Sequence, residues 1–196
     1  MNVFDMKQLG TELGLTERLF VTRENGERVY PYLAQAFKNI SDKQVLILVF
    51  PENQLIDASF ADECIVQIGR QLLNGEFGHR GFLLQGLTAN SVKNISSVIA
   101  FHGLQLGFLA VEPTDEWQCV GQIGESLLEV LNMIGQRRQI TAPELAEVLK
   151  IEVNTVNNRL KRLHNCRLIW REHEVSEKGL QYIYHFWDWT SNSSTS

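Results

Sequence analysis

The run QVLILVF at residues 44–50, which is apolar from Val45 onward, narrows the possible folds of this chain more than any other stretch. A strand with one solvated face alternates apolar and polar residues, whereas an uninterrupted run of this length indicates a strand buried on both faces. Residues 51–54 turn the chain, and residues 58–73 then place apolar side chains at a helical period until Asn74 and Gly75 stop the helix. The segment therefore predicts a strand, a turn and a helix.

This pattern of strand and helix recurs along the first part of the chain. The other predicted elements are, in chain order, a strand at 18–22, a helix at 27–40, a strand at 81–87, a helix at 88–101 and a strand at 104–111. Strands that alternate with helices indicate a layered α/β domain. The alternation stops at Pro113 and its acidic neighbours, so we assign this domain to residues 1–115.

The rest of the chain predicts a second, α+β domain at residues 116–189. An amphipathic helix with apolar positions from Val120 to Ile134 links the two domains, and the boundary between them falls in this helix. Residues 190–196 are uniformly small and polar, which is typical of a disordered tail.

Two short helices follow the linking helix. Thr141 is suited to cap the first of them, and Glu144 stands where the acid of a capping box reaches back. Residues 150–152 turn the chain after two helical turns, and Asn154 can cap the second helix. The two helices and the turn between them predict a helix-turn-helix.

The second of these helices has one apolar side, on which Val156, Leu160 and Leu163 recur at a helical period. The opposite side is polar and basic, and it carries Thr155, Asn158, Arg159 and Arg162. Arg and Asn pair with guanine and adenine edges in the major groove, and Thr155, Lys161 and His164 suit phosphate contacts. After this helix, β-rich runs at 168–171 and 181–187 flank a polar turn that ends in Lys178 and Gly179, which predicts a hairpin.

Charge is divided unevenly along the sequence. Residues 1–135 hold 9 Lys and Arg against 16 Asp and Glu, whereas residues 136–196 hold 9 against 7. Residues 154–171 contain five basic side chains and no acidic one. A net charge of -5 for the whole chain argues against a protein that coats nucleic acid indiscriminately, while the local basic stretch favours one defined contact with it.

The run ELAEVLKIEVNTVNNRLKRLHNCRLIWRE (144–172) resembles bacterial winged helix-turn-helix regulators. In that family the second helix enters the major groove and the hairpin, or wing, touches the backbone or the minor groove. The resemblance implies base contacts from Thr155, Asn157, Asn158, Arg159 and Arg162, and phosphate contacts from Lys161, Arg167, Arg171, His173 and Lys178. We expect strong losses of binding from Arg159→Ala and Arg162→Ala and a mild loss from Lys178→Ala, because acids in the wing (Glu172, Glu174 and Glu177) oppose phosphate binding there. The alternative is a winged helix used for docking or dimerisation.

The run QVLILVFPENQLIDASFADECIVQIGRQL (44–72) resembles STAS-type domains, in particular a STAS-like family with a SFADE helix start. The resemblance implies a mixed sheet with helices. In STAS domains that antagonise anti-sigma factors, a kinase-type ATPase phosphorylates a serine at a helix start; Asp57 matches the aspartate of that motif and Ser59 the phosphoacceptor. The other interpretation of Ser59 is a helix N-cap, with the Phe60 ring covering the site.

Several other classes of protein are not expected. The three cysteines and five histidines are scattered without metal-ligand spacing, and no nucleophile elbow or pair of catalytic acids is present, so we expect no metal, no cofactor and no enzymatic activity. No stretch approaches the roughly 18 apolar residues of a membrane span, and the start of the chain lacks the features of a signal peptide. We therefore expect a cytoplasmic protein without a membrane segment.

Two functions remain open at this point. The first is a duplex-DNA-binding transcriptional regulator whose STAS-like domain senses a protein or other signal, and the second is a partner-switching interaction module. We expect a homodimer, because winged-helix regulators usually read two half-sites. Apolar residues of the linking helix and the aromatic C-terminal end are the predicted interface, the latter comprising Tyr182, Tyr184, Phe186, Trp187 and Trp189.

Overall fold

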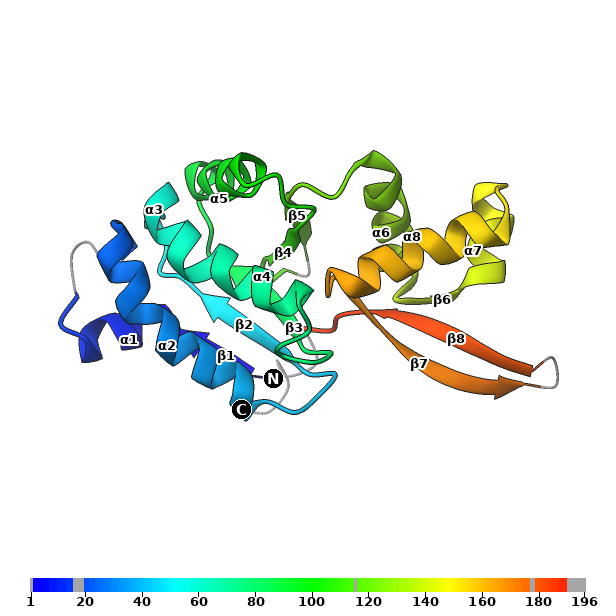
Figure 1. The fold of residues 1–196 in the computed structure, drawn as a ribbon, viewed down its shortest axis with the longest axis horizontal. Helices are drawn as coiled ribbons and strands as arrows, with labels where there is room; N and C mark the ends of the chain where they lie inside the picture. The colour runs from blue at the N-terminus through cyan, green and yellow to red at the C-terminus, as the bar shows by residue number, and fades with distance from the viewer. Residues whose placement is uncertain (1, 16–19, 115, 177–178, 190–196) are drawn as a thin grey trace.

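The computed structural model describes residues 2–15, 20–114, 116–176 and 179–189. These residues form a five-stranded sheet of order β1-β2-β3-β4-β5 and a three-stranded sheet of order β6-β8-β7. The first sheet and its helices occupy one half of an elongated molecule, and the second sheet with helices α6 to α8 occupies the other (Figure 1). The mixture of α and β elements in both halves confirms the predicted general class.

Parallel pairing dominates the first sheet. Its strands are β1 (Asn2–Asp5), β2 (Val45–Val49), β3 (Gly81–Gln85), β4 (Gly107–Val111) and β5 (Trp117–Gly121). The first four are parallel in chain order, and β5 returns antiparallel to β4. Right-handed crossovers between parallel strands that advance in one direction place every crossover helix on the same face of the sheet.

The helices of this half lie together on one face. They are α1 (Met6–Glu12), α2 (Arg23–Asn39), α3 (Ala58–Phe60), the π-helix η1 (Ala61–Val66), α4 (Gln67–Leu73) and α5 (Ala89–Phe101). Their apolar side chains form a first core with Leu46 and Leu48 of β2. Val45 and Ile47, which point to the other face, belong to a second core.

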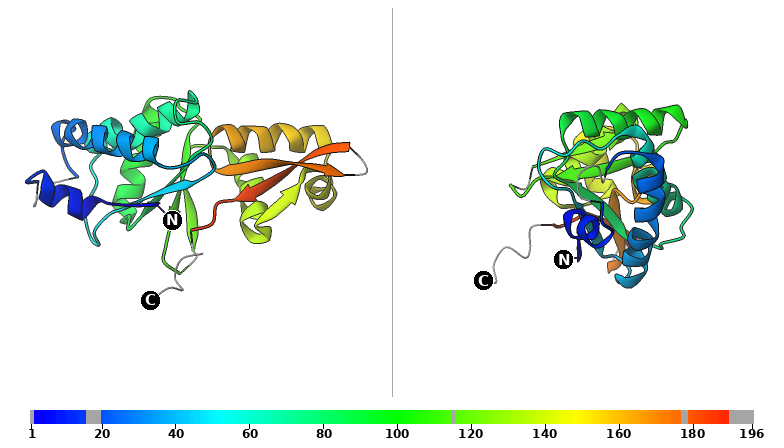
Figure 2. Two further views of the ribbon diagram at one scale, coloured as in Figure 1. Left: turned by 90° about the horizontal axis from the view of Figure 1, so that it is seen from below. Right: turned by 90° about the vertical axis from the view of Figure 1, so that its left-hand side faces the viewer.

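The winged half supplies the remainder of that second core. Its elements are α6 (Glu125–Arg137), β6 (Gln139–Thr141), α7 (Ala142–Leu149), α8 (Val153–Asn165), β7 (Ile169–Ser176) and β8 (Gly179–Phe186). The predicted capping box of α7 is present, since Thr141 and Glu144 bond reciprocally. The backbone bond from Thr141 lowers the pKa of Glu144. Figure 2 shows the hairpin of β7 and β8 extending away from the end of the molecule that carries α1.

Side chains of the two halves interlock where the second core meets the sheet; we call this contact region the seam. Trp187 is 3% exposed and covers Gly81 of β3 so closely that a Cβ there would lie 2.6 Å from its ring. Its indole nitrogen donates to the carbonyl of Arg167 at 2.8 Å. Trp117 of β5 packs on Phe186 with ring centroids 4.8 Å apart. The winged half therefore covers the sheet face that the crossover helices leave open.

Three expectations differ from the structure. The opening residues form strand β1, whereas Phe20, Val21 and Thr22 form no strand and residues 18 and 19 lie outside the described residues. Val120 lies in β5, and the linking helix begins only at Glu125, because residues 117–121 pair with β4 instead of coiling. Helix α8 begins at Val153, so Asn154 is not its N-cap.

The division of the chain at residue 115 stays a prediction, although β5 places residues 117–121 in the first sheet. Most of the residues predicted to form a dimer interface are covered within the chain. Tyr184, Phe186, Trp187 and Trp189 of the aromatic end are all buried within the chain, as are the main apolar positions of α6. The predicted tail, residues 190–196, lies outside the described residues.

Candidate nucleic-acid interface

Helix α8 presents one polar, basic side to solvent. Val156, Leu160 and Leu163 are completely buried against the second core. Five residues of the predicted contact set lie on α8 and are exposed, and they are Thr155, Asn157, Asn158, Lys161 and Arg162. Their hydroxyl, amide and cationic groups are the ones that bind base edges and phosphates. The exposed side of α8 is therefore the candidate surface for contact with nucleic acid.

Arg159 is oriented differently from its neighbours on α8. Its Nη1 lies 3.1 Å from a carboxylate oxygen of Glu129 on α6, and its side chain is only 22% exposed. An ion pair at this distance holds the guanidinium toward α6 and partly neutralises it. Glu129 was not anticipated, since it lies 30 residues away in the sequence.

The C-terminal end of α8 lies in the seam. His164, expected at a phosphate, is 5% exposed, and its ring lies 5.1 Å from that of His79. Burial, followed by Arg171, Arg167 and His79, lowers the pKa of His164 to about 4, so the ring is neutral at pH 7. His164 is therefore not available as a cationic phosphate contact.

Arg167 also interacts with the C-terminal end of α8 and not with its exposed side. It adopts a left-handed backbone conformation, with φ of 60°, and donates from Nη1 to the carbonyl of His164 at 3.0 Å. Burial lowers the pKa of its guanidinium. A cation bonded to a terminal carbonyl stabilises a helix end. The predicted contact of Arg167 with phosphate stays a prediction, and in this structure its guanidinium bonds to the end of α8.

In the described part of the wing, the predicted cation Arg171 is not freely exposed. Arg171 is half-buried and stacks on Tyr182 with its guanidinium 4.1 Å from the ring centroid. Glu172 lies 3.0 Å from His185, while His173 and Val175 are exposed. The predicted contact Lys178, like Glu177, lies outside the described residues.

The turn between α7 and α8 adds a residue that the sequence analysis missed. Lys150 is exposed, adopts a left-handed conformation with φ of 54°, and lines the same surface hollow as Thr155. Glu147 and Glu152 line that hollow too. A basic residue at the helix-turn-helix turn was the available signal, but it lies just before the basic stretch that begins at residue 154.

The predicted phosphoacceptor region lies at the opposite end of the molecule from the wing (Figure 1). Asp57 caps the helix formed by residues 58–73, because its Oδ1 accepts the amide of Phe60 at 2.7 Å. Its Oδ2 accepts the amide of Thr22, which precedes α2, at 2.9 Å. Ser59 is exposed in the first turn and is not the cap. Phe60 is completely buried and packs edge-on against Phe20, so its ring does not cover Ser59.

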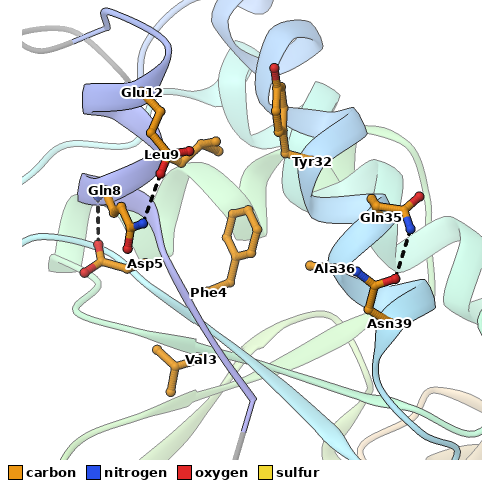
Figure 3. A pocket seen from close by; sticks show the side chains of 10 residues that line it. All are labelled: Val3, Phe4, Asp5, Gln8, Leu9, Glu12, Tyr32, Gln35, Ala36 and Asn39. Atoms are coloured by element: carbon orange, nitrogen blue, oxygen red, sulfur yellow. Dashed lines mark hydrogen bonds between the residues drawn. The ribbon is translucent and has the colours of Figure 1, made fainter.

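A hollow beside the edge strand β1 contrasts with α8 in its charge. Figure 3 shows its side chains, which come from β1, α1 and α2. Asp5 and Glu12 supply its charged groups, and no Lys or Arg is among the residues that line it. Phosphates are repelled by such a surface.

The described residues, which omit 1, 16–19, 115, 177–178 and 190–196, contain neither a cluster of metal ligands nor a membrane-spanning helix. No group of three or more His, Cys, Asp or Glu side chains converges there as it would around a metal ion. No helix in this part of the chain combines the length and the apolar character needed to cross a membrane.

Comparison with known proteins gives one match, and it falls on this interface. No curated protein and no solved structure matches the chain. A family model described as winged helix-turn-helix DNA-binding matches residues 125–169, from the start of α6 to the first residue of β7. The match leaves the first sheet and most of the hairpin outside, and the structure adds the hairpin expected of a wing. Residues 125–169 are thus a winged helix-turn-helix domain of the DNA-binding type.

Proposed function

We propose that this protein is a transcriptional regulator that binds duplex DNA at specific sequences through the exposed side of α8. The observation that carries the proposal is the exposure of Asn158, Lys161 and Arg162 along one side of a helix whose other side is buried. Such a helix fits the major groove, where Arg pairs with guanine and Asn with adenine. No catalytic step forms part of the proposal.

The electrostatics favour a narrow contact over general coating of DNA. Arg159 is paired with Glu129 and Arg167 lies in the seam, which leaves Lys161 and Arg162 as the exposed cations of α8 itself. The chain as a whole carries a net charge of -5. Few phosphate contacts give a shallow dependence of affinity on salt, so specificity has to come from base contacts.

Arg162→Ala tests this proposal. Selection of bound duplexes from a random pool, followed by fluorescence anisotropy at several salt concentrations, would give the preferred sequence and its affinity. We expect Arg162→Ala to weaken binding to that sequence roughly tenfold or more, because one base contact is lost. Lys161→Ala is expected to lower the slope of log affinity against log salt by about 1.

Two matched variants control for general charge effects. Arg28 is an exposed arginine of α2 in the other half, and Arg28→Ala removes the same charge without touching α8. We expect this variant to bind like the unaltered protein, and Arg159→Ala to lose less affinity than Arg162→Ala. Folded protein that binds no duplex at low salt would refute the proposal.

The N-terminal half is proposed to sense a protein or other signal. Support comes from the seam, where the end of α8 contacts residues that precede β3, with the His79 and His164 rings 5.1 Å apart. A ligand that shifts this sheet would act directly on the end of the reading helix. Homodimerisation belongs to the same proposal and needs a surface other than α6 and the aromatic end.

The second candidate function is a partner-switching module in which a kinase-type ATPase phosphorylates Ser59 and the winged helix docks or dimerises. The exposure of Ser59 beside the cap Asp57 favours it, because unpaired amides of a first helical turn stabilise added negative charge. A mass increase of one phosphate, absent in Ser59→Ala, would support this function. If protein isolated from its own cells carries no phosphate at Ser59, this second function is contradicted and the DNA-binding regulator remains the proposal.

A further inference from the structure

Two cysteines approach each other across the seam from different halves of the molecule. Cys119 lies on β5, and Cys166 directly follows α8. Both are half-buried and pack against the second core. The third cysteine, Cys64, is completely buried in the first core and therefore has no part in this arrangement.

Both sulfur atoms contact the same short segment. The Cys166 thiol donates to the carbonyl of Gln105, with Sγ and O 3.6 Å apart. The Sγ of Cys119 lies 3.1 Å from the position that a Cβ would take on Gly107, and Leu168, two residues after Cys166, lies 3.7 Å from that position. Gln105 and Gly107 are two residues apart, so both thiols lie beside the same short segment.

The electrostatics agree with this proximity and distinguish the two thiols. Burial raises the pKa of Cys119 to about 12, and the negative charge of an ionised Cys166 contributes to this rise. Burial also raises the pKa of Cys166, but Arg162 and Arg167 oppose the increase. Because a thiolate is the reactive species, Cys166 is the better nucleophile of the pair.

We propose that Cys119 and Cys166 form a reversible disulfide when the protein meets a two-electron oxidant such as hydrogen peroxide. The thiolate of Cys166 attacks one peroxide oxygen, and the O–O bond breaks to release hydroxide and leave a sulfenic acid on Cys166. The thiol of Cys119 then attacks that sulfur, which forms the S–S bond and releases water. Peroxide is reduced to water and hydroxide while the two sulfurs are oxidised.

The bond would connect the sheet directly to the end of the reading helix. It closes a loop that contains α6, α7 and α8, and it leaves the exposed side of α8 open. A link of this kind limits the separation of the two halves and stabilises the folded chain. Reduction by cellular thiols restores both cysteines, as is typical of redox-sensing pairs in reducing compartments.

The test uses the full-length protein and three single variants, Cys119→Ser, Cys166→Ser and Cys64→Ser. Each is treated with a small excess of hydrogen peroxide, quenched, and analysed by intact mass and by mapping of unreduced peptides. We expect the unaltered protein and Cys64→Ser to lose two mass units and to give a peptide that joins residues 119 and 166. The other two variants should lose no mass, and dithiothreitol should reverse the change.

Thermal unfolding gives a second readout that does not depend on peptide recovery. Oxidation should raise the midpoint of the unaltered protein by roughly 5–10 °C and leave that of both seam variants unchanged. The proposal is overturned if folded protein does not lose two mass units. It is also overturned if the disulfide that forms involves Cys64 or links two chains. DNA binding is not part of this test, so its result is independent of the proposed function.

Discussion

The two faces of the five-stranded sheet are covered in different ways. One face carries helices from its own crossovers, with Phe37 stacked on Phe77 at 5.0 Å between ring centroids. The other carries the winged half, with Trp187 over Gly81. Glycine permits the close approach on each side, since a Cβ on Gly69 of α4 would lie 2.6 Å from Leu106 and one on Gly81 equally close to the Trp187 ring.

This difference means that the winged half completes the fold of the sheet. Parallel strands are stable only when both faces are covered, and the crossover helices cover just one. The second core therefore joins residues of β2, β3 and β4 to those of α6, α8 and β8. Two halves that share a core are expected to unfold together, unlike two independent domains on a linker.

Trp187→Ala is the strongest test of this comparison. Removal of a large, fully packed ring typically costs about 3–5 kcal/mol, and we expect a loss of this size in the free energy of unfolding. Phe37→Ala, on the other face, should cost a similar amount. Urea titration followed by circular dichroism and by tryptophan fluorescence measures both losses.

The tryptophans make cooperativity visible in the same experiment. All four, Trp117, Trp170, Trp187 and Trp189, pack in or against the second core, so their fluorescence reports on that side alone. A shared core predicts that fluorescence and circular dichroism change at one urea midpoint in Phe37→Ala. Two separate midpoints would show that the halves fold independently.

The contribution of the seam to stability should depend on pH, because His164 is buried there in its neutral form. The folded-state pKa is about 4, below the ordinary 6.5, so folding releases the proton. The stabilising effect of the neutral ring is fully present above pH 6.5 and is lost as the pH falls toward 4. Protonation would place a charge beside Arg167, Arg171 and His79.

The measurement compares the unaltered protein with His164→Gln at pH 7.5 and at pH 5.5, where few carboxylates have begun to titrate. We expect the unaltered protein to lose roughly 1–1.5 kcal/mol more of its unfolding free energy between these values than the variant does. Equal pH dependence in both proteins would contradict the neutral, buried state of this ring.

Local patterns predicted the winged half well, because its signals lie close together in the sequence. The capping box at Thr141 and the three-and-four spacing of Val156, Leu160 and Leu163 depend on neighbouring turns only. The pairing of Glu129 with Arg159 and the burial of His164 depend on contacts between distant segments. For this reason the exposed side of α8 could be predicted from the sequence, but the orientation of Arg159 toward Glu129 could not.

The first sheet shows the same limit. Strands β2, β3 and β4 stand out as apolar runs because they are central and buried on both faces. The edge strand β1 alternates between half-buried and exposed residues, and β5 includes the exposed Gln118, so their sequences resemble a polar start and the beginning of a helix. Coverage of the open face by Trp187 depends on chain segments more than 100 residues apart.

The smallest predicted effect concerns the helix start at residues 57–59, on the face covered by the crossover helices. Asp57 accepts the amide of Phe60 there and the amide of Thr22 from the start of α2, whereas Ser59 is exposed in the first turn. Loss of an N-cap typically costs about 1 kcal/mol, and loss of an exposed hydroxyl in a first turn under about 0.5 kcal/mol. We therefore expect Asp57→Ala to lower the free energy of unfolding measurably and Ser59→Ala hardly at all, by the same urea titration.

The pair of variants also separates structure from regulation at this helix. Asp57→Asn keeps an oxygen that can accept the Phe60 amide, so it should recover most of the stability lost in Asp57→Ala. If Ser59→Ala instead proved as costly as Asp57→Ala, the serine would have a structural role, and its exposure would not serve a modification. If Ser59→Ala is as stable as the unaltered protein, the hydroxyl does not contribute to the stability of the fold. Phosphorylation of Ser59 by a partner would then not disrupt a structural contact.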